Sequence, residues 1–212
     1  MLNIKDEYER ARNLSLKMKQ GFLVSLKYKD DREIYILGAF TELLKKSRIR
    51  FPEYFKKLQP PEPDFHVFTD DRKFYKQIEI VENLHWGRKR GNEDKVPFDK
   101  HKYLNDYNRC KIRVWYSFIR NINQKLTKHY GSNSWLLIYH NIEVSHISSN
   151  GFWINIIFNM KNEFAKRGLI NFSNSTYEKI FVINSGFTEL VTIYPKNKVI
   201  FSKYAQYSLE SN

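Results

Sequence analysis

Cysteine is almost absent from this chain of 212 residues, which contains only Cys110. A lone cysteine excludes an internal disulfide and a zinc site built from cysteines. A nucleophilic role would need a nearby base, of which the sequence gives no sign, so we expect an inert thiol. Long apolar runs are also lacking, because none approaches the ~20 residues of a membrane helix. The charged N-terminus does not resemble a signal peptide, and we therefore expect a cytoplasmic protein without a membrane partner.

Acidic residues are in short supply relative to basic ones. The chain has 36 Lys and Arg against 23 Asp and Glu, a net charge of +13. An excess of this size favours a polyanionic partner, most simply nucleic acid, with DNA placed ahead of RNA. The alternative is a basic surface that is merely solvated. Hydrophobic residues make up 42% of the chain, enough for a real core, so we expect a single domain over 1–212 with 1–30 as an N-terminal helical elaboration.

Hydrophobic periodicity predicts an alternation of helices and strands. Helical spacing covers 3–19, 32–47, 103–130 and 152–167, and 51–58 is interpreted as a short helix or turn. Strand patterns cover 64–69, 77–82, 134–141, 179–184 and 189–194. This order predicts an α/β fold in which helices flank a central mixed sheet.

Two carboxylates in the predicted hairpin are the strongest sign of chemistry. Asp64 begins the first strand, and Glu79 lies between two isoleucines in the second. A carboxylate inside an apolar strand is costly without a partner or a metal, and Mg²⁺ prefers hard oxygen ligands. Two acids on neighbouring strands could therefore hold one cation. The alternative is that Glu79 belongs to the solvent side of an amphipathic strand and that Asp64 caps a turn.

The segments Pro63-Asp64-Phe65 and Ile78-Glu79-Ile80 resemble the motif of the PD-(D/E)XK nuclease superfamily. The order of elements over roughly residues 30–195 is similar as well. The resemblance implies a restriction endonuclease-like core and hydrolysis of phosphodiester bonds with Mg²⁺ or Mn²⁺. The metal ligands that it implies are Asp64, Glu79, the main-chain carbonyl of Ile80 and, from the preceding helix, Glu42. Because nucleases of this fold often pair to cut both strands, a homodimer is left open.

The lysine of this motif is missing, because Val81 stands in its place. That lysine normally orients the attacking water and stabilises negative charge on the phosphate, and valine can do neither. We expect Lys125 on the long helix to replace it, ahead of Lys111 and Lys100. Glu82 is disfavoured, because residues three apart in a strand point to opposite faces. A catalytically dead protein that keeps the fold for binding is the other outcome.

Basic residues follow the second strand as Arg88-Lys89-Arg90, and Trp86 lies just before them. This loop is the best candidate for contacts with backbone phosphates, although a solvated loop is the plain alternative. Three functions remain in view: a metal-dependent nuclease, an inactive relative that binds nucleic acid or a protein, and an assembly protein whose charge is incidental. His66 shares the face of Asp64 by alternation and could touch the site, or simply pack within its strand.

Overall fold

The computed structural model describes residues 1–17, 29–83, 118–140, 169–172, 175–183, 189–194 and 201–203. The predicted helix 152–167 and most of the predicted helix 103–130 lie outside these ranges. So do the basic segment 88–90, Trp86, Lys100, Lys111 and Cys110.

The described strands form one mixed sheet in which spatial order follows sequence order, from β1 to β8. The three central strands, β4, β5 and β6, run parallel to one another, and all other neighbouring pairs are antiparallel. The prediction of a mixed α/β fold is therefore confirmed. The strands are β1 (Leu2–Asn3), β2 (Tyr54–Lys57), β3 (Phe65–Phe68), β4 (Phe74–Asn83), β5 (Ser134–His140), β6 (Tyr177–Ile183), β7 (Glu189–Tyr194) and β8 (Phe201–Lys203).

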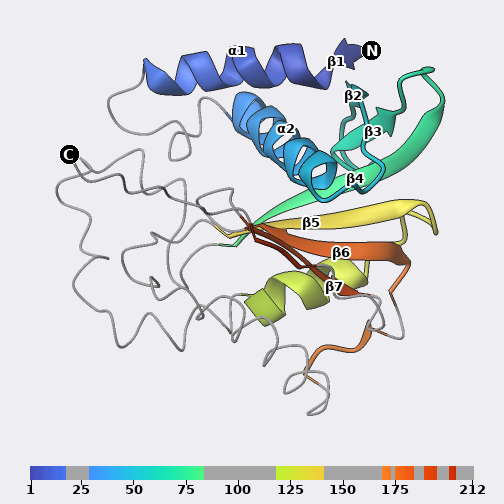
Figure 1. Ribbon diagram of the computed structural model, residues 1–212. Coiled ribbons are helices and arrows are strands. Elements are labelled where there is room, and N and C mark those ends of the chain that lie inside the picture. The colour runs from blue at the N-terminus through green and yellow to red at the C-terminus, as the bar shows by residue number, and fades with distance from the viewer. Residues whose placement is uncertain are drawn as a thin grey trace, which may run out of the picture.

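Helices cover both faces of this sheet (Figure 1). On one face lies α2 (Lys29–Lys46), and α1 (Ile4–Leu16) packs on top of it. On the other face lies the helix over residues 118–126. It belongs to the long connection between β4 and β5, as a parallel pair of strands requires. Among the described helices, none is both long and apolar enough to cross a membrane.

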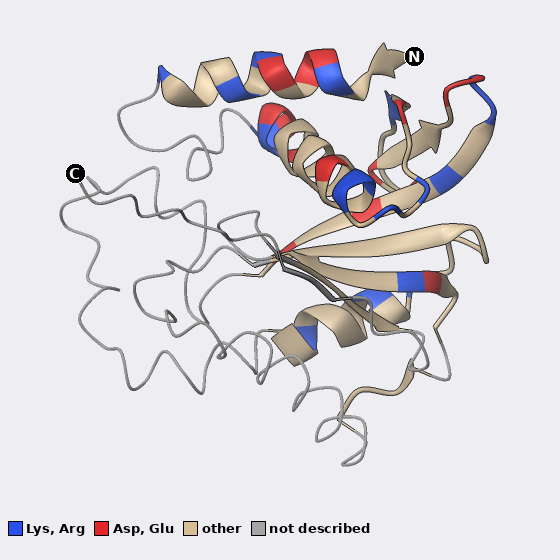
Figure 2. Cartoon of the chain, in the orientation of Figure 1, with Lys and Arg blue, Asp and Glu red and all other residues tan. Residues whose placement is uncertain are grey.

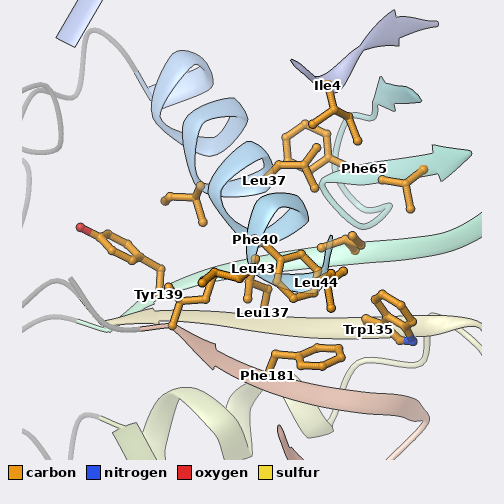
Figure 3. Close-up of a cluster of buried hydrophobic side chains, with 14 of the residues drawn as sticks. Ile4, Leu37, Phe40, Leu43, Leu44, Phe65, Trp135, Leu137, Tyr139 and Phe181 are labelled. Atoms are coloured by element: carbon orange, nitrogen blue, oxygen red, sulfur yellow. The ribbon is translucent and has the colours of Figure 1, made fainter. Parts of the chain in front are cut away.

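Strand β5 is buried on both sides, which explains its unbroken apolar sequence. Trp135, Leu137 and Tyr139 join the core under α2, and Leu136 and Ile138 join the core over helix 118–126. Figure 3 shows side chains of α2 packing down onto the strands in the first of these cores. Alternate residues of each central strand therefore face one helical layer or the other, and this alternation decides which side chains face the candidate site.

Two predicted elements differ from the structure. The segment 51–58 contains strand β2 instead of a short helix or turn, so that prediction is wrong. The strand forms because Phe55 is 1% exposed in the core and pairs with Val67 of β3. The helix predicted to end at Gly131 ends at residue 126, after which the amide of Lys128 donates to the Lys125 carbonyl.

Gly38 permits the close packing of α1 on α2. A Cβ added at this position would overlap the Cβ and Cγ atoms of Tyr8. These two atoms lie next to the main chain, where a side chain has little freedom to move away. We expect Gly38→Ala to lower the free energy of unfolding by about 1–3 kcal/mol, since overpacking forces the helices apart. Urea unfolding measures this loss. Combining the substitution with Tyr8→Ala should restore part of the stability that Gly38→Ala removes, and a strictly additive double variant would contradict the explanation.

Candidate functional site

The hairpin of β3 and β4 brings the two predicted acids together on one face of the sheet. Phe65 pairs with Ile78, and both are fully buried in the core under α2. Asp64 and Glu79 each lie one position away in this antiparallel register, so they are cross-strand neighbours on the opposite face. That face carries Val81 and helix 118–126. The predicted convergence of the two acids therefore agrees with the observed register.

Asp64 extends the hydrogen bonding of the hairpin with its side chain. Because β3 starts at Phe65, the Oδ2 atom of Asp64 accepts the next main-chain bond, from Ile80 N–H at 2.7 Å. Burial and then the nearby Glu79 carboxylate raise the pKa of Asp64 to about 6, although the bond from Ile80 opposes the rise. This carboxylate is thus held in a place where its negative charge is unfavourable, which is characteristic of functional sites.

Glu79 is 3% exposed and contacts two lysines from the helical layer below the sheet. Its Oε1 atom accepts from the Nζ of Lys125 and, at 3.3 Å, from the Nζ of Lys128. Lys125 lies at the end of helix 118–126, and Lys128 lies just beyond it. The structure therefore places Lys125, the residue expected to replace the missing motif lysine, directly against Glu79. Its catalytic role remains a prediction.

The raised pKa of Asp64 predicts that Asp64→Asn increases the stability of the folded protein, by an amount that depends on pH. A carboxyl whose pKa is higher in the folded protein favours folding when it is protonated. Its contribution is complete below pH 3.8 and is lost as the pH rises through about 6. The neutral asparagine avoids this loss, so we expect Asp64→Asn to be more stable than the wild type by about 1–3 kcal/mol at pH 8 without metal.

Urea unfolding of both proteins from pH 4 to pH 8 measures this gain, which should disappear towards pH 4. Asp70→Asn removes an exposed carboxylate in the hairpin turn and serves as the control for loss of one negative charge. A stability difference that is the same at every pH would contradict the proposed cause.

Glu42 does not lie with the other two acids. It lines a cavity of about 210 Å³ between α1, α2 and residues 51–53, together with Tyr8 and Glu53. Glu53 donates its amide to the carbonyl of Phe68, so this cavity lies at the end of β3 remote from Asp64. The structure thus gives no support to Glu42 as a metal ligand.

Glu33 is the α2 acid whose charge reaches Asp64, where it adds to the raised pKa. It is buried, and Lys57 of β2 binds it at 2.7 Å. The only sequence signal for this position is weak: Glu33 lies next to the apolar stripe of α2. Within the described residues, no group of three or more His, Cys, Asp and Glu side chains is placed to hold a metal ion.

The residues present nevertheless fit a cation held by two carboxylates, as Mg²⁺ often is when water and phosphate supply its other ligands. The contacts above use Oδ2 of Asp64 and Oε1 of Glu79, which leaves the second oxygen of each outside these bonds. The carbonyl of Ile80 points to the same side as its amide, towards Asp64. Tyr177 also carries a buried hydroxyl that has no hydrogen-bond partner in the described ranges. The atoms available as metal ligands are therefore oxygen atoms, as a hard divalent cation requires.

The remaining candidates lie elsewhere or outside the described residues. The ring of His66 packs edge-on against Phe74 at 5.3 Å, within the hairpin. The described residues carry 20 Lys and Arg against 16 Asp and Glu, so most of the net charge of +13 lies outside them. On α1 and α2 the basic residues alternate with acidic ones (Figure 2). The segment Arg88-Lys89-Arg90 is outside the described residues, so its role as a phosphate contact stays a prediction.

Comparison with known proteins returns no relative. No protein-family model matches the chain, and neither the curated proteins nor the solved structures contain a match.

Proposed function

We propose that this protein is a metal-dependent nuclease that hydrolyses phosphodiester bonds, with DNA as the first candidate substrate. The observation that carries the proposal is the arrangement around Glu79. Asp64 is its neighbour across the hairpin, and Lys125 contacts its carboxylate from the helical layer. Two acids and a lysine at one point are the groups that the PD-(D/E)XK motif combines, with the lysine supplied here from another element.

The order of elements supports the same proposal. Helix α2, the β3–β4 hairpin, helix 118–126, strand β5 and the late pair β6–β7 follow one another in the order on which the resemblance rests. The restriction endonuclease-like core is accordingly our proposal for the fold family.

Asp64, Glu79 and the carbonyl of Ile80 would hold the Mg²⁺ or Mn²⁺ ion. When bound, such an ion lowers the pKa of a water molecule and stabilises charge on the phosphate. Lys125 would stay at the rim of this pair, where its ammonium group can offset negative charge that develops on the phosphate. Lys128 donates to the hydroxyl of Tyr130 at 2.7 Å, which holds its side chain in place. Its role would be to neutralise part of the negative charge of Glu79.

The substrate is proposed on the basis of charge. A net charge of +13 suits binding to a phosphate backbone, and such binding weakens as salt is added. A homodimer that cuts both strands of a duplex stays within the proposal.

One observation favours a second candidate, an inactive protein of this fold that binds nucleic acid. Lys125 and Lys128 already neutralise Glu79, and a buried carboxylate paired in this way is explained without a metal. In that case Glu79 would only tie helix 118–126 to the sheet.

A cleavage assay separates the two candidates. The purified chain is incubated with labelled single- and double-stranded DNA and with RNA, in Mg²⁺, in Mn²⁺ and in excess chelator. Cleavage that requires the metal supports the nuclease. Binding that falls with salt, without any cleavage in either metal, supports the inactive protein. Absence of both results would remove nucleic acid as the partner.

A further inference from the structure

Tyr177 places a buried hydroxyl beside the candidate site. It is the first residue of β6 and is 2% exposed, and its hydroxyl has no hydrogen-bond partner within the part of the chain that the structure describes. The ring is held in the core over helix 118–126 and meets the ring of Tyr130 edge-on, with centroids 6.2 Å apart. A phenylalanine would fill this space without leaving a polar atom unsatisfied, which is costly in a core.

The surroundings of this hydroxyl are those of the two acids. Burial raises the pKa of Tyr177 well above its ordinary value, and the charges of Glu79 and Asp64 raise it further. The phenol therefore stays protonated and acts as a hydrogen-bond donor. Neither carboxylate accepts from it, because this hydroxyl has no hydrogen-bond partner among the described residues.

A short series of side-chain contacts links Tyr177 to Glu79. Lys128 Nζ donates to the hydroxyl of Tyr130 and also lies over its ring, 5.3 Å from the centroid. The same ammonium contacts Glu79. Tyr130 is thus anchored to Glu79 through Lys128, and Tyr177 packs against it. Tyr177 is accordingly connected to the acid pair through Tyr130 and Lys128.

We propose that Tyr177 is a hydrogen-bond donor of the site, and that its hydroxyl binds an oxygen ligand of the cation held by Asp64 and Glu79. The inference rests on the proposed function, because it presupposes that these acids bind a cation. The oxygen belongs either to a water molecule or to a phosphate. Both are acceptors that a protonated phenol can bind, and both are ligands that Mg²⁺ keeps in protein sites.

The test is Tyr177→Phe, which removes the hydroxyl and leaves the ring. Free Mn²⁺ is measured by electron paramagnetic resonance, first with Mn²⁺ alone and then with Mn²⁺ and inorganic phosphate. We expect the variant to bind Mn²⁺ about three- to tenfold more weakly, the usual worth of one neutral hydrogen bond. Weaker binding of Mn²⁺ alone identifies water as the acceptor, whereas weakening only with phosphate present identifies phosphate.

Two controls separate a role in binding from a role in folding. Without metal, the melting temperature of Tyr177→Phe should equal or exceed that of the wild type, because the deleted hydroxyl bonds no described residue. Tyr139→Phe deletes a hydroxyl from a buried tyrosine in the core on the opposite face of the sheet. It should leave Mn²⁺ affinity unchanged.

The outcomes distinguish this inference from the proposed function. If the wild type binds Mn²⁺ and Tyr177→Phe binds it equally well in both conditions, the role of Tyr177 is disproved and the metal site stands. If the wild type binds no Mn²⁺, the metal site fails and the inference fails with it. If Mn²⁺ binding weakens as expected but no nucleic acid is cleaved, Tyr177 is supported and only the nuclease activity is lost.

Discussion

Replacing Glu79 with glutamine is expected to reduce metal-dependent cleavage by about a thousandfold or more, as loss of a ligand from a catalytic metal site does. The substitution keeps the shape of the side chain and removes its charge. Glutamine offers a weak neutral oxygen to a cation that prefers carboxylates. It also leaves Lys125 and Lys128 without their common partner, although both lysine side chains are partly exposed and can turn towards water.

The matched control is Glu178→Gln on β6. Glu178 is also a strand glutamate bound by a lysine, Lys76, and its change should leave cleavage near the wild-type rate. Initial rates at saturating substrate, with circular dichroism and a melting curve for each variant, give the comparison. A folded Glu79→Gln protein that cleaves at the wild-type rate would end the proposal that this acid holds the metal.

Lys125→Met is expected to lower kcat by about a hundredfold with little change in KM, because a group that stabilises developing charge acts mainly in the transition state. Methionine retains the apolar stem of the side chain and loses only the ammonium group. Lys125 is the better candidate of the two lysines on Glu79, since its side chain is 23% exposed against 45% for Lys128. Lys128 is in addition bound to Tyr130.

We therefore expect Lys128→Met to lower kcat by about tenfold or less, since it removes a partner of Glu79 rather than a group at the phosphate. Lys76→Met breaks the comparable pair with Glu178 and should not affect cleavage. Steady-state kinetics of the three variants rank these contributions. Equal losses for Lys125→Met and Lys76→Met would show that any lost lysine weakens substrate binding, and Lys125 would then have no special role.

Local patterns in the sequence were sufficient to predict the acid pair. Asp64 and Glu79 belong to one hairpin, and a hairpin brings together residues that are close along the chain. Alternation then places both on one face. A glutamate between two isoleucines also stood out, because an apolar strand does not tolerate a charge without a partner. The unbroken apolar run of residues 134–141 likewise predicted a strand, and the structure shows that β5 is buried on both sides.

Other features were beyond such patterns. The polar sequence around Phe55 did not predict a strand. Strand β2 forms because this phenylalanine is buried when it pairs with β3. On α2, Glu42 and Glu33 both fit a helical carboxylate near the hairpin. The helix axis separates them by roughly 13 Å, at 1.5 Å per residue, and only packing decides which end approaches Asp64.

The sequence by itself determined an α/β chain with two acids on adjacent strands and a valine two residues after the second acid, because these features depend on neighbouring residues. Only the tertiary structure decided which side chains surround the acids. Lys125 is 46 positions from Glu79 along the chain, and Tyr177 comes from a strand two places away in the sheet. Periodicity shows which face of an element is buried. The partner on that face is fixed only when the helices and strands of the whole domain pack together.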